Sequence, residues 1–284
     1  MEDVKVLQKA LIRLGFDPGP VDGVVGTRTR AAVFVWRIAN GMPAAGDEIE
    51  RIVAEAAALD RPTYVTGIDI SGNNADTTDE GDDDEDMAKV KAAGHSFVIV
   101  KSSEGARYRY KAMARLRAAA TTAGLDVGHY HFALPHKNPT DPFAEARNWH
   151  EHAGGLGWDY LPMFDIEDHR YDTFVAGSAT KRDPRKQKAL ESWCLRLLDQ
   201  ADNLFGEECG VYTGSWYWQG WLGSTKAFAG RKLWLAAYPA KEPKPDAVPP
   251  KLGAWKPTIW QYTATGTVPG LEGRFDVNRL YGSP

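Results

Sequence analysis

Residues 160–167 read Tyr-Leu-Pro-Met-Phe-Asp-Ile-Glu, a short apolar run that ends in two acids. A run of this length is typical of a buried strand. Side chains two positions apart on a strand share a face, so Asp165 and Glu167 are predicted to project together while Phe164 and Ile166 pack the other way. Core packing explains two carboxylates on one face poorly. In barrels of parallel strands the carboxyl ends of the strands carry the chemistry, so this stretch marks a candidate active site.

Similar runs lie on both sides of this one. We predict strands at Gly67–Ile70, Ser96–Lys101, Val127–Phe132, Tyr160–Ile166, Gly210–Thr213, Lys232–Ala237, Thr258–Tyr262 and Arg274–Val277. Helical patterns lie between them, near residues 107–123, 141–153 and 186–204. This alternation predicts an α/β fold with a parallel sheet, and the number of strands fits an irregular (β/α) barrel with a reduced number of helices. An open doubly wound sheet is the alternative.

Two further acids, Asp69 and Asp276, are each embedded in a short apolar strand. Taken alone, either one fits a cap or a satisfied buried acid as well as it fits a functional group. Together with Asp165 and Glu167 they make an acid cluster at strand ends the better interpretation.

At this point the sequence resembles the glycoside hydrolase family 25 muramidases over residues 64–281. The matching segments are Gly67–Ser71, Phe97–Lys101 with Ser103–Gly105, Gly128–Phe132, Phe164–Glu167, Leu233–Tyr238, Ile259–Tyr262 and Asp276–Asn278. The resemblance implies that Glu167 is the catalytic acid/base and that Asp165 is its partner, with Asp69 and Asp276 completing the site.

Glycoside hydrolysis needs an acid for the departing oxygen and negative charge facing the anomeric carbon. Crowding of like charges raises one carboxyl pKa, so we expect Glu167 to be protonated near neutral pH while Asp165, Asp69 and Asp276 stay ionised. The resemblance implies retention of anomeric configuration. The spacing of the two strand positions fits both a covalent carboxylate adduct and assistance by the substrate's 2-acetamido group.

Aromatic residues are expected to form the sugar platform, because their flat rings suit pyranose faces. By resemblance, the substrate-binding residues are Tyr130, Trp234, Tyr238, Trp260, Gln261 and Tyr262. Trp149 and Trp193 lie in helical patterns and are assigned to the core. His129 and His131 share a strand face, but no third ligand follows at a metal-site spacing, so we predict no metal site and no cofactor.

The first 60 residues predict a small three-helix domain. Val4, Leu7, Leu11 and Leu14 recur at helical spacing, a second helix over residues 27–39 carries Ala31, Phe34, Val35 and Ile38 on one face, and a third carries Ile49, Ile52, Val53 and Ala56. The unit resembles the peptidoglycan-binding domain 1 family in Leu7-Gln8, Leu14-Gly15-Phe16, Val21-Asp22-Gly23 and Gly26-Thr27-Arg28-Thr29. Wall binding is implied, and a helical docking or dimerisation unit is the alternative.

The predicted organisation is a helical domain at 1–59, a short linker at 60–63 and a barrel at 64–284. The net charge of −4 is unevenly distributed, because residues 76–86 carry eight acids and no base while the rest of the chain is mildly basic. We interpret this acidic stretch as a solvated loop. The chain shows no clustered basic face for nucleic acid and no apolar run long enough for a membrane. Cys194 and Cys209 are expected to be buried thiols.

The two resemblances imply a peptidoglycan hydrolase, most simply a monomeric phage endolysin. We expect it to be made in the cytoplasm without a signal peptide and to act on the cell wall after release. A chitinase-like glycosidase is the second interpretation, although Tyr160-Leu161-Pro162-Met163 stands where its further acids are expected. A wall-anchoring protein with an inactive barrel is the third.

Overall fold

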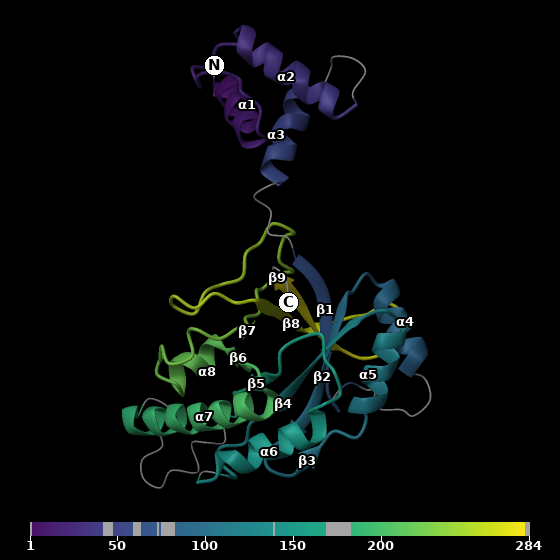
Figure 1. Ribbon diagram of the computed structural model, residues 1–284, viewed down its shortest axis with the longest axis vertical. Coiled ribbons are helices and arrows are strands. Elements are labelled where there is room, and N and C mark those ends of the chain that lie inside the picture. Colours follow the sequence, from purple (N-terminus) through teal and green to yellow (C-terminus); the bar gives the residue numbers. More distant parts are fainter. Residues whose placement is uncertain are drawn as a thin grey trace. The chain divides into compact units, whose positions relative to one another are not determined.

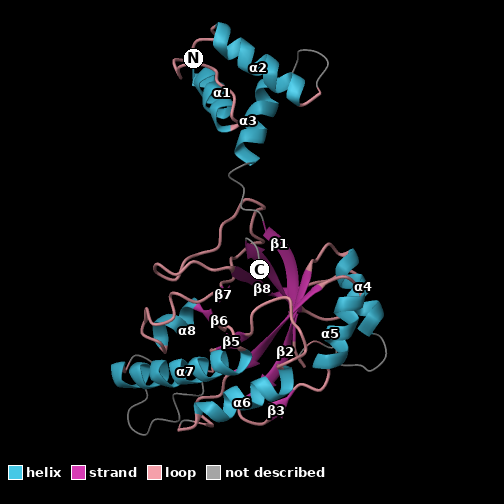
Figure 2. Cartoon of the chain, viewed as in Figure 1, coloured by secondary structure: helices cyan, strands magenta, loops and turns pink. Residues whose placement is uncertain are grey.

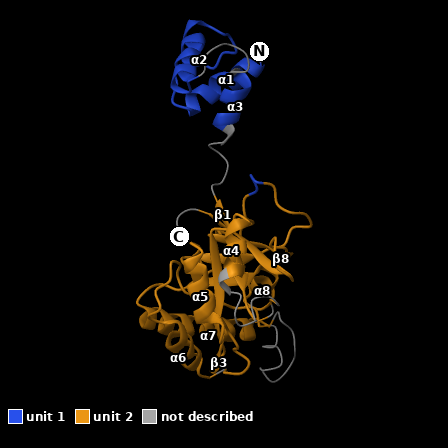
Figure 3. Cartoon of the chain, turned by 90° about the vertical axis from the view of Figure 1, so that its right-hand side faces the viewer, with its two compact units in different colours: residues 1–62, 245–247 blue, residues 63–244, 248–284 orange. Residues whose placement is uncertain are grey.

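The computed structural model describes residues 2–41, 48–58, 64–72, 74, 83–138, 140–168 and 183–281. The chain forms two compact units (Figure 3), one of Met1–Pro62 with Pro245–Ala247 and one of Thr63–Lys244 with Val248–Pro284. The predicted linker at residues 60–63 and most of the acidic stretch lie outside the described residues. Among the described residues, no helix has the length and apolar character that crossing a membrane requires.

The small unit contains the helices α1 (Glu2–Arg13), α2 (Thr27–Ala39) and α3 (Glu48–Ala58), shown in Figure 1. Its buried core consists of Leu7, Ala10, Leu11, Ala32, Trp36, Ile52 and Ala56. The predicted apolar face of the second helix is wrong: Phe34, Val35 and Ile38 are exposed, and Trp36 is buried instead. Trp36 Nε1 donates to Glu55 Oε2 on α3 at 2.8 Å, and this hydrogen bond links α2 to α3.

The motif residues of this unit hold the loop between α1 and α2. Buried Gln8 donates through Nε2 to Asp22 Oδ1 at 2.9 Å and to the Val24 carbonyl at 3.1 Å. Its Oε1 accepts from the Gly23 amide at 3.0 Å. Gly23 has a φ of +81°, a conformation that favours glycine. The Gln8 and Val21-Asp22-Gly23 elements are therefore structural partners.

The large unit is a closed barrel of eight strands. These are β1 (Tyr64–Ile70), β2 (Phe97–Glu104), β4 (Asp126–Phe132), β5 (Met163–Asp165), β6 (Gly210–Gly214), β7 (Leu233–Ala236), β8 (Ile259–Gly266) and β9 (Phe275–Tyr281). Pairing of β1 with β2 closes the ring, so the open-sheet alternative is wrong. A ninth strand, β3 (Tyr108–Arg109), forms a hairpin with the end of β2.

The sheet is not wholly parallel, contrary to the prediction. Strands β1, β2 and β4 to β8 pair in parallel with one another, but β9 is antiparallel to both of its neighbours, β1 and β8. Only eight residues separate β8 from β9, too few for a helical crossover, so this pair connects as a hairpin.

Helices cover part of the barrel (Figure 2): α4 (Asp83–Ala92), α5 (Met113–Thr122), α6 (Pro142–Ala153), α7 (Pro184–Phe205) and the short α8 (Ser215–Gly220). The fully described connections at residues 237–258 and 267–274 contain no helix, which confirms the reduced helix number. Helix α4 corrects the solvated-loop prediction for the end of the acidic stretch, because Asp86 and Met87 are buried. Asp86 pairs with Lys89 at 3.3 Å within the same helix.

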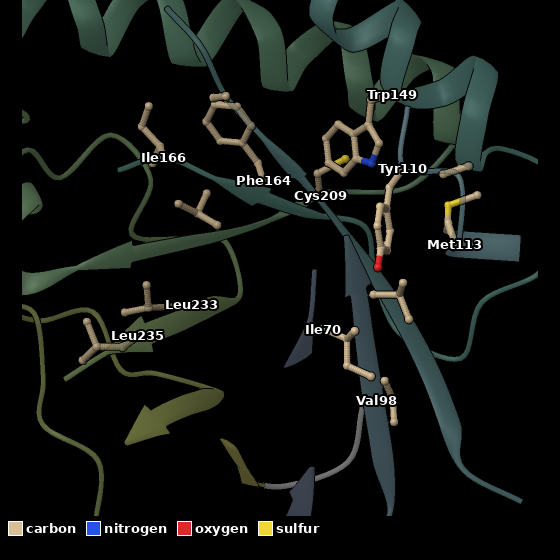
Figure 4. Close-up of a cluster of buried hydrophobic side chains, with 14 of the residues drawn as sticks. Ile70, Val98, Tyr110, Met113, Trp149, Phe164, Ile166, Cys209, Leu233 and Leu235 are labelled. Atoms are coloured by element: carbon tan, nitrogen blue, oxygen red, sulfur yellow. The ribbon is translucent and has the colours of Figure 1, made fainter. Parts of the chain in front are cut away.

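Strand alternation divides the core of the large unit. Outward-facing Ile70, Val98, Phe164 and Leu233 pack with helical residues such as Trp149 (Figure 4). A separate inward-facing cluster contains Phe97, Ile99, Tyr130, Met163, Tyr212, Trp234, Ala236, Ile259 and Leu280. The apolar interior therefore ends where the polar residues at the carboxyl ends of the strands begin.

Candidate active site

A cleft of about 470 Å³ opens in the large unit among residues at the carboxyl ends of the parallel strands. Its acids are Asp69, Glu104, Asp165, Glu167 and Asp276. Its aromatic wall consists of Tyr130, Phe132, Tyr212, Trp234 and Tyr238. The structure therefore brings all four predicted catalytic carboxylates to one hollow.

Strand register explains why these acids meet. Asp69 on β1 lies directly opposite Asp276 on antiparallel β9, and residues paired in this way share a face of the sheet. Asp165 is the last residue of β5, and Glu167 follows two residues later. The predicted strand at residues 160–166 is shorter than expected, so Glu167 projects from the loop after β5.

Asp69 is held by two amide groups. Its Oδ2 accepts from Gln261 Nε2 at 2.9 Å and from Asn278 Nδ2 at 2.8 Å. All three side chains are buried, and Gln261 lies opposite Asn278 on β8 and β9. Asp69 is therefore fixed in position by donors that favour its charged form.

A second layer of hydrogen bonds orients those amides. Gln261 Oε1 accepts from the hydroxyl groups of Tyr212 at 2.9 Å and Tyr238 at 2.6 Å, so its Nε2 faces Asp69. Asn278 Oδ1 accepts from Trp234 Nε1 at 2.8 Å. An indole nitrogen only donates, which fixes the orientation of the Asn278 amide.

Lys101 is the cation of the cleft. Its Nζ lies 2.7 Å from Glu104 Oε2 and 4.9 Å from the centre of the Phe132 ring. Lys101 is 13% exposed and Glu104 is 27% exposed, so solvent screens this pair only partly. Its positive charge lowers the pKa of both Asp165 and Glu167, opposing the effect of burial.

Asp165 has an oxygen without a partner. The residue is 4% exposed, and its Oδ1 is buried with no hydrogen bond from the part of the chain that the structure describes. An unpaired buried carboxylate oxygen is costly for folding. Such an atom lining a cleft is suited to accept a hydrogen bond from a ligand.

Burial and mutual repulsion set the acidity of the cluster. Burial, then the charge of Asp276, raises the pKa of Glu167 to about 7. Burial raises the pKa of Asp276 to about 6. Desolvation also raises the pKa values of Asp69 and Asp165 well above the usual range. Burial thus raises the pKa of every acid in the cluster, which gives the expected protonation of Glu167 a physical cause. That Asp165, Asp69 and Asp276 stay ionised remains a prediction.

The predicted sugar-binding residues divide into two groups. Tyr130, Trp234, Tyr238 and Gln261 line the cleft, and the Tyr238 side chain is 55% exposed. Trp260 and Tyr262 do not line it, because they alternate with inward-facing Gln261 on β8. Both contact the Arg279 guanidinium instead, with centroid distances of 5.9 and 5.1 Å. The expectation that these two rings contact the substrate in the cleft is therefore corrected.

Several site residues were not predicted as such: Lys101, Glu104, Tyr212 and Asn278. Lys101, Glu104 and Asn278 lie in segments that carried the family resemblance. A polar residue within an apolar strand is the sequence signal that could have identified them. Tyr212 gave no such signal, because its partner Gln261 is 49 residues away and only barrel closure brings them together.

His129 and His131 face outward against α6. The ring of His129 accepts from Trp149 Nε1 at 3.0 Å, while His131 lies 2.8 Å from Ser103 Oγ and 3.2 Å from Glu145 Oε2. Burial lowers the pKa of His129 to about 3. These histidines belong to the packing of the barrel wall. Cys194 and Cys209 are buried free thiols, as expected.

The family comparison decides the identity of the large unit. The family described as glycosyl hydrolases family 25 matches residues 68–271, more than half of the chain. The chain belongs to glycosyl hydrolases family 25. It is a glycoside hydrolase, and the resemblance noted in the sequence is confirmed. A putative peptidoglycan binding domain matches residues 1–46 of the small unit.

The chain is also similar to several lysozymes and muramidases. Lysozyme M1 of Streptomyces globisporus is 29% identical over 273 residues, which are 95% of this chain and 81% of that protein. An N,O-diacetylmuramidase of Chalaropsis sp is 30% identical over 62% of this chain and 80% of its own length. The crystal structure of a bacterial lysozyme from Streptomyces coelicolor superposes with a TM-score of 0.61 at 26% identity, covering 78% of this chain and 94% of that one.

Proposed function

We propose that this family 25 enzyme is an N-acetylmuramidase in which Glu167 protonates the leaving oxygen. The substrate is peptidoglycan, cleaved at the β-1,4 bond between N-acetylmuramic acid and N-acetylglucosamine. Family membership and the lysozyme and muramidase relatives support the reaction. The observation that carries the role of Glu167 is its position: it lines the cleft with Asp69, Asp165 and Asp276 and follows Asp165 by two residues at the carboxyl end of β5. Burial and the charge of Asp276 also raise its pKa, which favours a proton on this carboxyl group.

The geometry supports a division of roles among the acids. A glycosidase needs one carboxyl group that carries a transferable proton near the working pH, and Glu167 meets this requirement. Asp165 contributes a buried oxygen that no described residue engages, so it is available to the sugar at the reacting carbon. Asp69 is held in a fixed position by two amides. The intact set favours an active enzyme over a wall-anchoring protein.

The test is the substitution Glu167→Gln, which keeps shape and hydrogen bonding but removes the transferable proton. We expect a folded protein whose rate of peptidoglycan hydrolysis falls by about 100- to 10,000-fold. Glu207→Gln makes the same chemical change at an exposed position outside the cleft and serves as the control. Wild-type rates in Glu167→Gln would contradict the assignment.

We further propose that residues 1–59 bind the cell wall and that the whole chain works as a monomeric endolysin, produced in the cytoplasm and acting on the wall after release. The match of a putative peptidoglycan binding domain beside a hydrolase unit supports this arrangement. Expression inside a sensitive bacterium tests it: lysis is expected only when the membrane is permeabilised. Light scattering of the purified protein tests the monomer.

A further inference from the structure

A second hollow opens beside the acid cleft, at the turn between β2 and β3. It has a volume of about 460 Å³, and its walls include Arg107, Tyr108, Leu134 and Lys137. Glu104 lines both this hollow and the acid cleft, so the two meet at its side chain. A glycan bound in the cleft therefore has this hollow as a neighbour.

Charge distinguishes the two hollows. Among the described residues that line the cleft, Lys101 is the only cation beside the acid cluster. The second hollow carries Arg107 and Lys137, and its one acid, Glu104, is already paired with Lys101. Within the part of the chain that the structure describes, neither Arg107 nor Lys137 forms an ion pair. The hollow thus presents two uncompensated positive charges next to a negatively charged cleft.

The walls of this basic hollow are held by buried groups. Asn148 on α6 donates to the carbonyls of Gly105 at 2.9 Å and Tyr108 at 3.1 Å, which fixes both ends of the turn. Gly105 has a φ of +55°, and a Cβ there would lie 3.0 Å from Leu134 Cδ1. On the other wall, Asn138 donates to buried Glu145 at 2.7 Å. Arg107 and Lys137 are therefore carried on pre-formed loops.

An exposed aromatic ring completes the hollow. Tyr108 is 49% exposed, and Lys101 Nζ lies 5.7 Å from its ring centre. A surface with one apolar ring and two cations suits a flexible ligand that has both carboxylates and aliphatic groups.

We propose that this hollow binds the peptide stem attached to the muramic acid of the substrate, with Arg107 and Lys137 facing its carboxylates. The inference rests on the proposed muramidase function and adds a specificity subsite to it. Stem carboxylates are repelled by the acids of the cleft, so the neighbouring basic hollow is the favourable place for them. The contacts form in the ground state and the transition state alike, so they should act on KM more than on kcat.

The experiment compares one peptidoglycan preparation in two forms, both stripped of other wall polymers. The first keeps its peptide stems, and the second has lost them to an amidase. The double variant Arg107→Gln/Lys137→Gln should show a KM about three- to tenfold higher than wild type on the first form, with no change on the second. Added salt should shrink the difference, because it screens partly exposed charges.

A matched control is Lys226→Gln/Lys251→Gln, which removes the same charge from exposed positions at a different surface hollow. It should behave as wild type on both forms. An equal loss in Arg107→Gln/Lys137→Gln on both forms, or no loss on either, would overturn the subsite. A wild-type enzyme that releases no muramic acid reducing ends from either form would instead refute the proposed function.

Discussion

Two charges of opposite sign act on the pKa of Glu167, and each can be removed by a separate substitution. Asp276 raises the pKa of Glu167 and Lys101 lowers it. The rate falls as the pH rises through the pKa of the general acid, because only the protonated form donates. Asp276→Asn should therefore move the alkaline limb of the pH profile to lower pH, and Lys101→Met should move it to higher pH.

The measurement is kcat/KM against pH on a soluble glycan fragment, with each profile normalised to its own maximum. In the wild type the alkaline limb should lie near the pKa of about 7. Shifts of the same sign in both variants would show that Glu167 is not the titrating group.

For single residues, the sequence predicts the four acids of the cleft but few of the residues that contact them. The strand ends of Asp69, Asp165 and Asp276 and the position of Glu167 were readable from alternation and from family resemblance. The error at Trp260 and Tyr262 was avoidable, because neighbours of an inward-facing Gln261 must point away from the cleft. The tyrosine and asparagine contacts depend on barrel closure, which no local pattern specifies.

At the scale of elements, Gln8 shows how one buried amide sets a loop. It bonds to three groups between α1 and α2, including Asp22 and Gly23. Gln8→Ala leaves these groups without their partner and should lower the free energy of unfolding of the small unit by about 1–3 kcal/mol. Calorimetry should show a lower melting transition for this unit and an unchanged one for the barrel.

Lys9→Ala is the control, since Lys9 is the exposed neighbour on the same helix. If Gln8→Ala and Lys9→Ala melted alike, the structural role of the motif would be wrong.

The elements that sequence patterns misread have identifiable causes. Helix α4 carries buried Met87 and Val90 among six charged residues, so its apolar periodicity is too sparse to signal a helix. Helix α2 has the opposite problem, since apolar residues occur on every face and spacing alone does not select one. The structure buries the side that carries Ala32 and Trp36, and Trp36 also donates to Glu55 on α3. The barrel strands were located correctly along the chain, although β5 is shorter than the strand predicted at residues 160–166.

At the scale of the whole molecule, the division into two units implies that wall binding and catalysis can be separated by truncation. Among the described residues, the two cores of the barrel unit contain no residue of the small unit. Removal of residues 1–59 should therefore weaken sedimentation with peptidoglycan while leaving hydrolysis of short soluble fragments largely intact. Unchanged wall binding by the truncated protein would refute targeting by the small unit.

We propose that the acid cleft cleaves the bond that follows N-acetylmuramic acid, and the sugar found at the new reducing ends identifies the bond that is cut. Purified peptidoglycan is digested with the full-length enzyme, and the released fragments are reduced and analysed by mass spectrometry. We expect new reducing ends on N-acetylmuramic acid with the wild type, and almost none with Glu167→Gln. Reducing ends on N-acetylglucosamine, or muramic acid ends formed equally by Glu167→Gln, would contradict it.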